Sequence, residues 1–233
     1  MKNVKEINDN LIKFWDSSLT LTAEQKEEIQ QSQEIDYKEL APSPKLFDAV
    51  AGLSSCQKVL DYGCGSGWGA IIANKSGCLN VDAVDIGVNI IESLKVYTDA
   101  LNTHVNAFSI SPDWLKSVPN NYYDGIICSN VLDVLPIETT KEILKQLARI
   151  STPKAKVIIG LNFYMPPDVA KQRGMELIKN KYLFVNDVLR LLSLSDIEWK
   201  ELFSPYFIIE KLDYFAWPGE AKETRRLFLL IRK

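Results

Sequence analysis

The stretch 59–73 constrains this chain more than any other part of it, because glycine stands at every second position near its middle. It reads VLDYGCGSGWGAIIA. Its apolar start is typical of the end of a buried strand, and its last six residues predict the beginning of a helix. Glycine is used where the backbone takes a positive φ or where a ligand approaches closely. A strand, a glycine turn and a helix together aim backbone N–H groups and the positive helix end at one ligand.

Two registers of this loop predict different ligands. Counted from Gly65, the residues fit the dinucleotide pattern G-x-G-x-x-G/A, with Asp85 about 20 residues further on, which is typical of a NAD-dependent oxidoreductase. That register places Asp61 and Gly63 inside the strand, where both residue types are unfavourable. Counted from Asp61, the strand end, an acidic residue and the glycine loop form one unit, so this register is favoured. A tight turn that binds no ligand is the third alternative.

The favoured register resembles motif I of the class I S-adenosylmethionine-dependent methyltransferases, (D/E)-x-G-x-G-x-G, and matches it at every fixed position. The resemblance continues to about residue 160 and, more faintly, to residue 233. It implies S-adenosyl-L-methionine as cofactor and S-adenosyl-L-homocysteine as product. It implies that the methionine end of the cofactor is received by Asp61, Gly63, Gly65 and Gly67. Asp85, which we expect in an exposed loop, would hold both ribose hydroxyls, and Ile86 would lie against the adenine.

Two later segments extend the resemblance. Similar enzymes place an acidic residue after the third strand, here 105–110, to contact the adenine amino group. This chain offers Ser111 or Asp113 there, with the register open, and Trp114 either stacks on the base or belongs to the core. The segment 122–132 resembles the fourth strand of the family and its exit loop. Ser129 and Asn130 stand at the carboxyl end of that strand and are expected to touch the cofactor.

The sequence does not identify a catalytic residue. His104 is the only histidine, and it lies in a connection away from the carboxyl ends of the strands, where ligands bind. The Asn-Pro-Pro-Tyr type of motif found in amino-directed nucleic-acid methyltransferases is absent. The four cysteines form no C-x-x-C pair, so no metal site is expected and all four are interpreted as packing residues.

The order of the expected elements predicts an α/β, Rossmann-like three-layer sandwich. Its sheet would have seven mostly parallel strands and end in an antiparallel pair, 207–214 and 226–231. We expect one methyltransferase domain, 1–233, with a helical cap at 1–52 and a core at 53–233 that carries an insertion near 163–184. Within the core, Asn186 is expected to cap one short helix and Ser195 another.

Charge and hydropathy narrow the partners and the location. The net charge is −3 without any run of Lys or Arg, which argues against a nucleic-acid partner. No apolar run reaches membrane-spanning length, and the first residues lack the apolar core of a signal peptide. We therefore expect a cytoplasmic protein without a membrane partner. The oligomeric state stays open.

The acceptor half of the reaction is predicted only by topology. The N-terminal helices, with Trp15 and Tyr37, and the insertion, with Tyr164 and Asp168, are the sizeable pieces that the sheet does not need. We expect them to meet over the strand ends and to enclose a small-molecule acceptor. A protein or RNA acceptor, and a module that binds the cofactor without turnover, remain alternatives. A catalytic base is needed only if the acceptor atom holds a proton.

Overall fold

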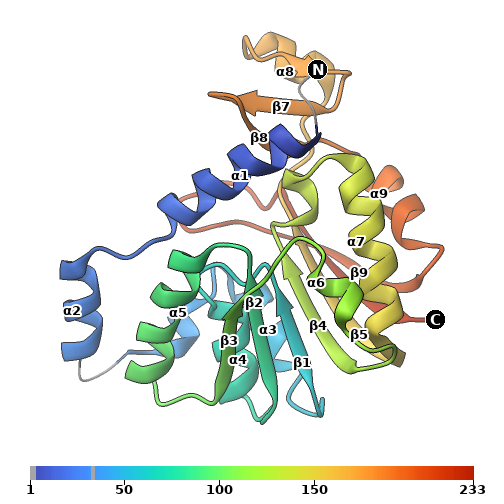
Figure 1. Cartoon of the computed structure of the whole chain (residues 1–233). Coiled ribbons are helices and arrows are strands. Elements are labelled where there is room, and N and C mark those ends of the chain that lie inside the picture. Colours follow the sequence, from blue (N-terminus) through green and yellow to red (C-terminus); the bar gives the residue numbers. More distant parts are fainter. Residues whose placement is uncertain (1–3, 33–34) are drawn as a thin grey trace.

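A seven-stranded sheet forms the centre of the molecule, in the order β3-β2-β1-β4-β5-β10-β9 (Figure 1). The computed structural model describes residues 4–32 and 35–233. The parallel strands are β1 (Val59–Tyr62), β2 (Val81–Asp85), β3 (Val105–Ser109), β4 (Tyr123–Ser129) and β5 (Ser151–Leu161). The antiparallel strands are β9 (Phe207–Phe215) and β10 (Arg225–Arg232), so the predicted C-terminal pair is confirmed.

Helices cover both faces of the sheet and make the predicted three layers. One face carries η1 (Tyr37–Leu40), α3 (Pro44–Ala51), α4 (Trp68–Lys75) and α5 (Val88–Ala100). The other carries α6 (Trp114–Ser117), α7 (Ile137–Ile150) and α9 (Asp196–Phe203). Successive strand residues alternate between the two cores, as Leu60 and Val59 do. Because both faces are buried, the central strands are almost continuously apolar.

Strand β1 lies where the connections change direction. It pairs in parallel with β2 on one side and with β4 on the other. In such sheets ligands bind outside the carboxyl ends of the strands at this switch point. The glycine loop follows β1 directly, so the fold places it in that crevice.

Helix α1 (Val4–Ser18) crosses the molecule above this edge of the sheet, and α2 (Ala23–Gln31) follows it beside α5 (Figure 1). Leu11 packs with Val134 and Val188 in a small cluster of its own. Val134 belongs to η2 (Leu132–Val134), which follows β4. The first helix is thus fixed to the exit of β4. In contrast, α3, which also lies in the expected cap region, packs into the core on the face of the sheet that α4 and α5 cover.

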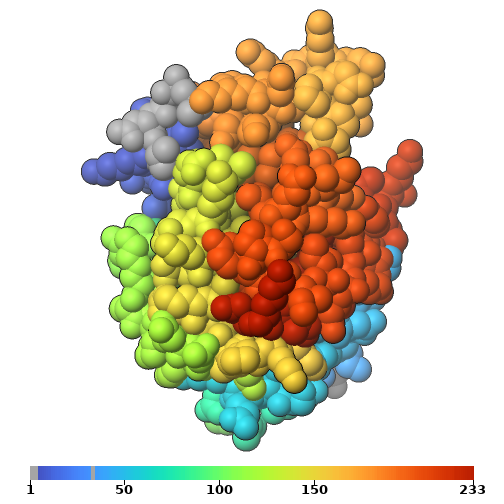
Figure 2. All heavy atoms as spheres, turned by 90° about the vertical axis from the view of Figure 1, so that its right-hand side faces the viewer, coloured from blue at the N-terminus to red at the C-terminus, as the bar shows by residue number. Residues whose placement is uncertain are grey.

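The insertion after β5 forms a separate small sheet, which stands above the body of the molecule (orange in Figure 2). It contains α8 (Pro167–Gln172), β6 (Leu177–Ile178), β7 (Tyr182–Val185) and β8 (Val188–Leu192). The expected helix after Asn186 is wrong. Asn186 and Asp187, with φ of 50° and 65°, close the β7–β8 hairpin. Two consecutive positive φ values are what a two-residue hairpin turn requires, and the apolar run that follows is a strand.

The predicted helix cap at Ser195 is confirmed. Ser195 forms a capping box with Glu198 at the start of α9, and Thr22 forms another with Gln25 at the start of α2. All four cysteines are free. Within the described ranges, no helix is long and apolar enough to cross a membrane, and no cluster of metal-ligating side chains occurs.

Candidate functional site

The glycine loop has the conformation that its sequence requires. Gly63, Gly65 and Gly67 have φ values of 68°, 53° and 79°. A Cβ on Gly63 would lie 2.3 Å from Cγ2 of Val131, and one on Gly67 would lie 2.0 Å from Cδ1 of Leu94. Both the left-handed backbone and the close packing therefore exclude larger residues at these two positions.

Asp61 supports the loop from below. The carboxyl group is 4% exposed, and its Oδ2 accepts a hydrogen bond of 2.8 Å from the backbone N–H of Ala70, in the first turn of α4. Burial raises the pKa of Asp61 to about 7, against the opposing effect of the Ala70 hydrogen bond. The other carboxylate oxygen makes no hydrogen bond within residues 4–32 and 35–233. Asp61 therefore holds α4 in place with one oxygen and leaves the second for a ligand.

Replacing Asp61 with asparagine should change how the stability of the free protein depends on pH. The ordinary pKa is 3.8 and the folded value is about 7, so the folded protein holds more protons than the unfolded chain between these values. Stability therefore falls as pH rises from about 4 to about 7 and is constant above that. Asparagine still accepts from Ala70 but carries no charge. We expect Asp61→Asn to lose this pH dependence and to melt above the native protein near pH 8.

Thermal melting curves of both proteins without ligand, taken between about pH 5 and pH 8, make the measurement. A native protein whose melting temperature is as flat over this range as that of the variant would show that Asp61 is already ionised at low pH. Asp99→Asn, at an exposed position of α5, is the matched control.

Asp85 ends β2 and binds the loop as well. Its Oδ2 accepts from the N–H of Gly65 at 3.1 Å, and its Oδ1 accepts from the N–H of Gly87 at 3.1 Å. The expectation of an exposed loop is wrong, because Asp85 is the last residue of strand β2 and is only partly exposed. Burial raises the pKa of Asp85, and the hydrogen bonds from the backbone oppose this. A carboxylate has about four acceptor positions. Two are used here, and the others are available to hydroxyl groups.

A cavity of about 660 Å³ opens beside these residues at the carboxyl ends of the strands. Its lining includes nine of the eleven positions predicted from the sequence: Asp61, Gly63, Gly65, Asp85, Ile86, Ser111, Asp113, Ser129 and Asn130. Gly67 and Trp114 do not line it. The Trp114 ring packs edge-on against Phe108 at 5.6 Å, on the core side of the chain.

Of the four residues predicted to lie near the methyl acceptor, one lines the cavity and three do not. Trp15 lines the cavity from α1, together with Leu11 and other residues of that helix. Tyr37, Tyr164 and Asp168 do not. The ring of Tyr37 lies 6.3 Å from that of Phe47, in the helical layer that contains α3, α4 and α5. The insertion meets α1 instead through β8, whose Arg190 lies 4.4 Å from the Phe14 ring.

Sequence reasoning missed several lining residues. Tyr62, Cys64 and Ser66 occupy the unspecified positions of the glycine motif and Trp68 directly follows it, so the place of the motif could have suggested all four. Leu19, Pro42, Trp217 and the residues of α7 reach the cavity from distant parts of the chain. No local pattern in the sequence indicates that these positions meet.

Asn130 offers a donor at the edge of the cavity. It has a φ of 57°, and its N–H binds the carbonyl of Gly160 at 2.8 Å. Its Oδ1 accepts from the Ser129 hydroxyl, while its Nδ2 is buried and has no hydrogen-bond partner among the described residues. Buried donors are almost always paired. The glycine cradle, the free acceptor positions of Asp85 and this donor together fit a zwitterionic nucleoside such as S-adenosylmethionine.

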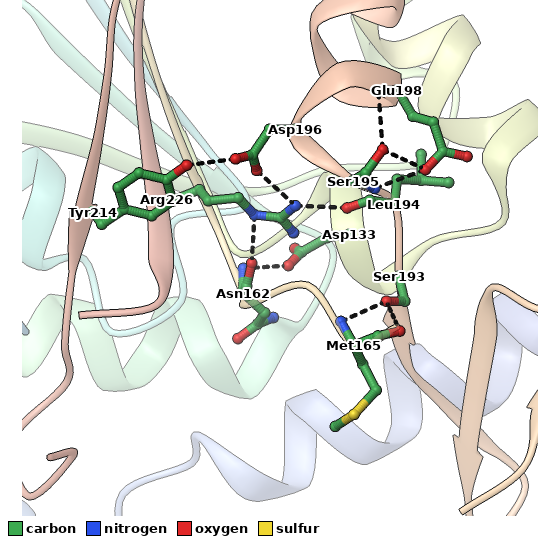
Figure 3. A network of polar contacts seen from close by, with 10 residues as sticks. All are labelled: Asp133, Asn162, Met165, Ser193, Leu194, Ser195, Asp196, Glu198, Tyr214 and Arg226. Atoms are coloured by element: carbon green, nitrogen blue, oxygen red, sulfur yellow. Dashed lines mark hydrogen bonds and ion pairs between the residues drawn. The ribbon is translucent and has the colours of Figure 1, made fainter. Parts of the chain in front are cut away.

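A buried polar network fixes the loops that follow β4 and β5 (Figure 3). Arg226, 1% exposed, donates to the carbonyls of Asn162 and Leu194 at 2.9 and 2.6 Å. Asp133, fully buried, accepts from the N–H of Asn162 at 2.5 Å. Burial raises the pKa of Asp133, and the nearby Arg226 charge opposes this. The network therefore ties η2, the exit of β5 and the base of the insertion to β10.

The described lining contains no evident general base. His104 is not part of it, and its backbone N–H binds Asn74 in a connection elsewhere. Asp113 is paired with Lys116 at 2.6 Å and Glu138 with Lys141 at 3.2 Å, and Glu142 accepts from the side-chain amide of Gln146 at 2.8 Å. Asp61 and Asp85 are engaged by backbone N–H groups. The arrangement can bind and position two ligands, and every carboxylate of the described lining has at least one oxygen engaged by another group.

Comparison with known proteins identifies the family. The sequence model of a family described as a methyltransferase domain matches residues 18–200. No curated protein sequence matches the chain. The structure resembles that of Burkholderia thailandensis 1,6-didemethyltoxoflavin-N1-methyltransferase, solved with 1,6-didemethyltoxoflavin and S-adenosylhomocysteine. The TM-score is 0.71 and the identity 14%, over 100% of this chain and 91% of that one.

Two further structures have the same fold. Magnesium protoporphyrin IX methyltransferase from Synechocystis PCC 6803, solved with S-adenosylhomocysteine, has a TM-score of 0.65 and 16% identity, over 95% of this chain and 99% of that one. The N-methyltransferase NodS from Bradyrhizobium japonicum WM9 has a TM-score of 0.63 and 11% identity, over 97% and 99%. The chain belongs to the methyltransferase-domain family and is an S-adenosylmethionine-dependent enzyme with its Rossmann-like fold.

Proposed function

We propose that this enzyme transfers the methyl group of S-adenosylmethionine to a small molecule that is enclosed beneath α1. The observation that supports this most is the continuous cavity. It extends from the glycine loop and Asp85 to Trp15 and Leu11 on the underside of α1. One end carries the residues expected to hold the cofactor, and the other end is covered by a helix that the sheet does not need.

The cofactor supplies a methyl group that its sulfonium already activates. On our proposal, Asp61, the glycine loop and Asn130 hold the methionine end. Asp85 holds the ribose, and Ile86 packs against the adenine beside Ser111 or Asp113. The carboxylate of Asp113 is already paired with Lys116, which favours Ser111 for the polar contact. We propose that all of these parts form one domain, with α1 as its lid.

The chemistry left to the protein is positioning and the exclusion of water. Transfer requires the acceptor atom near the methyl carbon and in line with it. An apolar cover such as α1 removes competing water from this space. Because each carboxylate of the described lining already has a partner on at least one oxygen, we favour an acceptor atom that is nucleophilic without losing a proton to the enzyme, as an unprotonated nitrogen is.

Charge supports a small acceptor over a nucleic acid. The carboxylates of Asp85, Glu138 and Glu142 line the cavity, and the only lysine of its lining, Lys116, is paired with Asp113. Phosphates need a basic surface, which this opening lacks. The structures with similar folds include enzymes named for toxoflavin and porphyrin substrates. The free cysteines suit the reducing cytoplasm, where we place the enzyme.

A labelling experiment tests the acceptor class. Purified enzyme receives methyl-labelled S-adenosylmethionine and a cell extract that ultrafiltration has divided into small molecules and macromolecules. We expect label to enter the small-molecule fraction. Ile12→Trp, which adds bulk on the cavity side of α1, should abolish this transfer while S-adenosylhomocysteine still binds, because Ile12 lines the cavity from α1 and not from the glycine loop or β2.

The alternative functions give different results. Label in the protein or RNA of the macromolecular fraction would overturn the small-molecule proposal. Binding of S-adenosylhomocysteine without transfer to either fraction would indicate a non-catalytic binding module. Calorimetry with NAD tests the remaining alternative, a NAD-dependent oxidoreductase, and we expect no binding.

A further inference from the structure

Asp16, near the end of α1, is bound to the first turn of α5. Its Oδ1 accepts from the backbone N–H groups of Asn89 and Ile90, at 3.0 and 3.3 Å. Its Oδ2 accepts from the side-chain amide of Asn89 at 2.7 Å. Gly87, the residue at the N-cap position just before α5, provides no side-chain cap of its own. A carboxylate from α1, more than 70 residues away in the sequence, therefore caps α5.

Gly87 allows this close approach. Its φ of −78° and ψ of 121° suit any residue, so the backbone does not require glycine here. A Cβ at this position would lie 2.5 Å from Oδ1 of Asp16 and 2.7 Å from Cδ1 of Ile90. The Ile90 contact involves a flexible side-chain end, whereas Asp16 is fixed by three hydrogen bonds. The absence of a side chain at Gly87 is thus explained by the docking of α1.

The cap adjoins the ribose corner of the proposed cofactor site. Asp85 binds the N–H of Gly87, and Asp16 binds the N–H groups two and three residues further on. One short turn therefore serves both carboxylates. A ligand held by Asp85 orders the same turn that Asp16 needs in order to hold α1.

Further contacts fix the direction in which α1 crosses the cavity. The N–H of Leu21, just after α1, donates to the Ser93 hydroxyl of α5 at 2.9 Å. Leu19 lines the cavity above Gly65. At the other side of α1, the Arg190 guanidinium of β8 lies over the rings of Phe14 and Trp15, at 4.4 and 5.3 Å. The helix thus spans the cavity from α5 to the insertion.

We infer that Asp16 is a positioning residue that couples cofactor binding to the closure of α1 over the cavity. The inference rests on the proposed function of α1 as a lid. Asp16 touches no substrate. It keeps Trp15 and Leu19 over the cavity, and it does so at the turn that Asp85 shares with the cofactor. Two events that order the same turn favour each other, so each should strengthen the other.

Hydrogen exchange measured by mass spectrometry tests this coupling with S-adenosylhomocysteine as the probe. In the native enzyme, the ligand should slow exchange in the peptides of α1. Asp16→Ala should lose this protection and bind S-adenosylhomocysteine about 5- to 150-fold more weakly by calorimetry, the usual range of coupling between sites. Gly87→Ala should act in the same direction, because its Cβ displaces the Asp16 carboxylate.

Two controls separate positioning from general damage. Asp9→Ala removes the same charge from an exposed position of the same helix and should retain both the affinity and the protection. Asp16→Asn keeps an oxygen for the backbone N–H groups and should recover most of the coupling. Melting temperatures without ligand report on folding alone.

The outcomes also separate this inference from the cofactor assignment. Native enzyme that fails to bind S-adenosylhomocysteine would overturn both. Binding in Asp16→Ala with undiminished protection of α1 would overturn the positioning role and leave the cofactor assignment standing. The positioning role would be established if Asp16→Ala and Gly87→Ala lose the protection of α1 and Asp9→Ala behaves like the native enzyme.

Discussion

Replacing Asp85 with alanine should weaken S-adenosylhomocysteine binding by about 1–3 kcal/mol, which is roughly 5- to 150-fold. The variant removes the charged acceptor that we assign to the ribose hydroxyls. It also removes the partner of the Gly65 and Gly87 N–H groups, which orient the glycine loop and the first turn of α5. Calorimetry on the native enzyme and the variant gives the difference directly.

The same variant should also lower the stability of the free protein. Two backbone N–H groups lose their acceptor, and each buried unpaired donor costs about 1–3 kcal/mol, less where water replaces the partner. Asp85→Asn retains an acceptor oxygen, so its stability and its affinity should lie between those of the native enzyme and Asp85→Ala. Asp99→Ala, with the same charge change at an exposed site on α5, should alter neither property. Unchanged affinity in Asp85→Ala would mean that another residue holds the ribose.

Replacing Arg226 with methionine should lower the free energy of unfolding by about 3–5 kcal/mol, because it breaks a buried charged network. The guanidinium is 1% exposed and binds the carbonyls of Asn162 and Leu194, which the shorter, apolar side chain would leave unpaired (Figure 3). The buried Asp133 would also lose the positive charge that favours its ionised form. Urea unfolding of the free enzyme measures the loss.

A double variant shows whether the two charges act as a pair. Asp133→Asn removes the negative charge, so the combination with Arg226→Met should cost less than the sum of the single changes. Additive losses would show that Arg226 acts only through its carbonyl partners. Lys211→Met is the control, since its exposed ion pair with Asp213 is worth about 0–1 kcal/mol.

The cofactor half of the site could be predicted from the sequence because its signals are local. The glycine spacing requires a backbone with positive φ at Gly63, Gly65 and Gly67, and the structure has it. The acidic residue at the end of the next strand is also a local pattern, and Asp85 lies beside the loop. The apolar strands and the C-terminal antiparallel pair determined the class of fold by their periodicity and order.

The cover of the cavity could not be predicted in the same way. Trp15 lines the cavity as expected. Tyr37 packs instead in the helical layer with α3 and α4, and Tyr164 is not part of the cavity lining. An aromatic residue in a surface helix looks the same in either place, because only the packing of whole elements decides which face it meets. The segment after Asn186, expected as a short helix, is strand β8, because a short apolar run is consistent with both.

The sequence by itself therefore determined the sheet, the glycine loop and the position of Asp85, since each follows from the preferences of neighbouring residues. The tertiary structure alone decided the contacts between distant segments. Asp16 caps α5, Trp217 reaches the cavity from the loop between β9 and β10, and burial raises the pKa of Asp61 to about 7. These depend on how layers pack and how far water is excluded, which no local pattern of residues specifies.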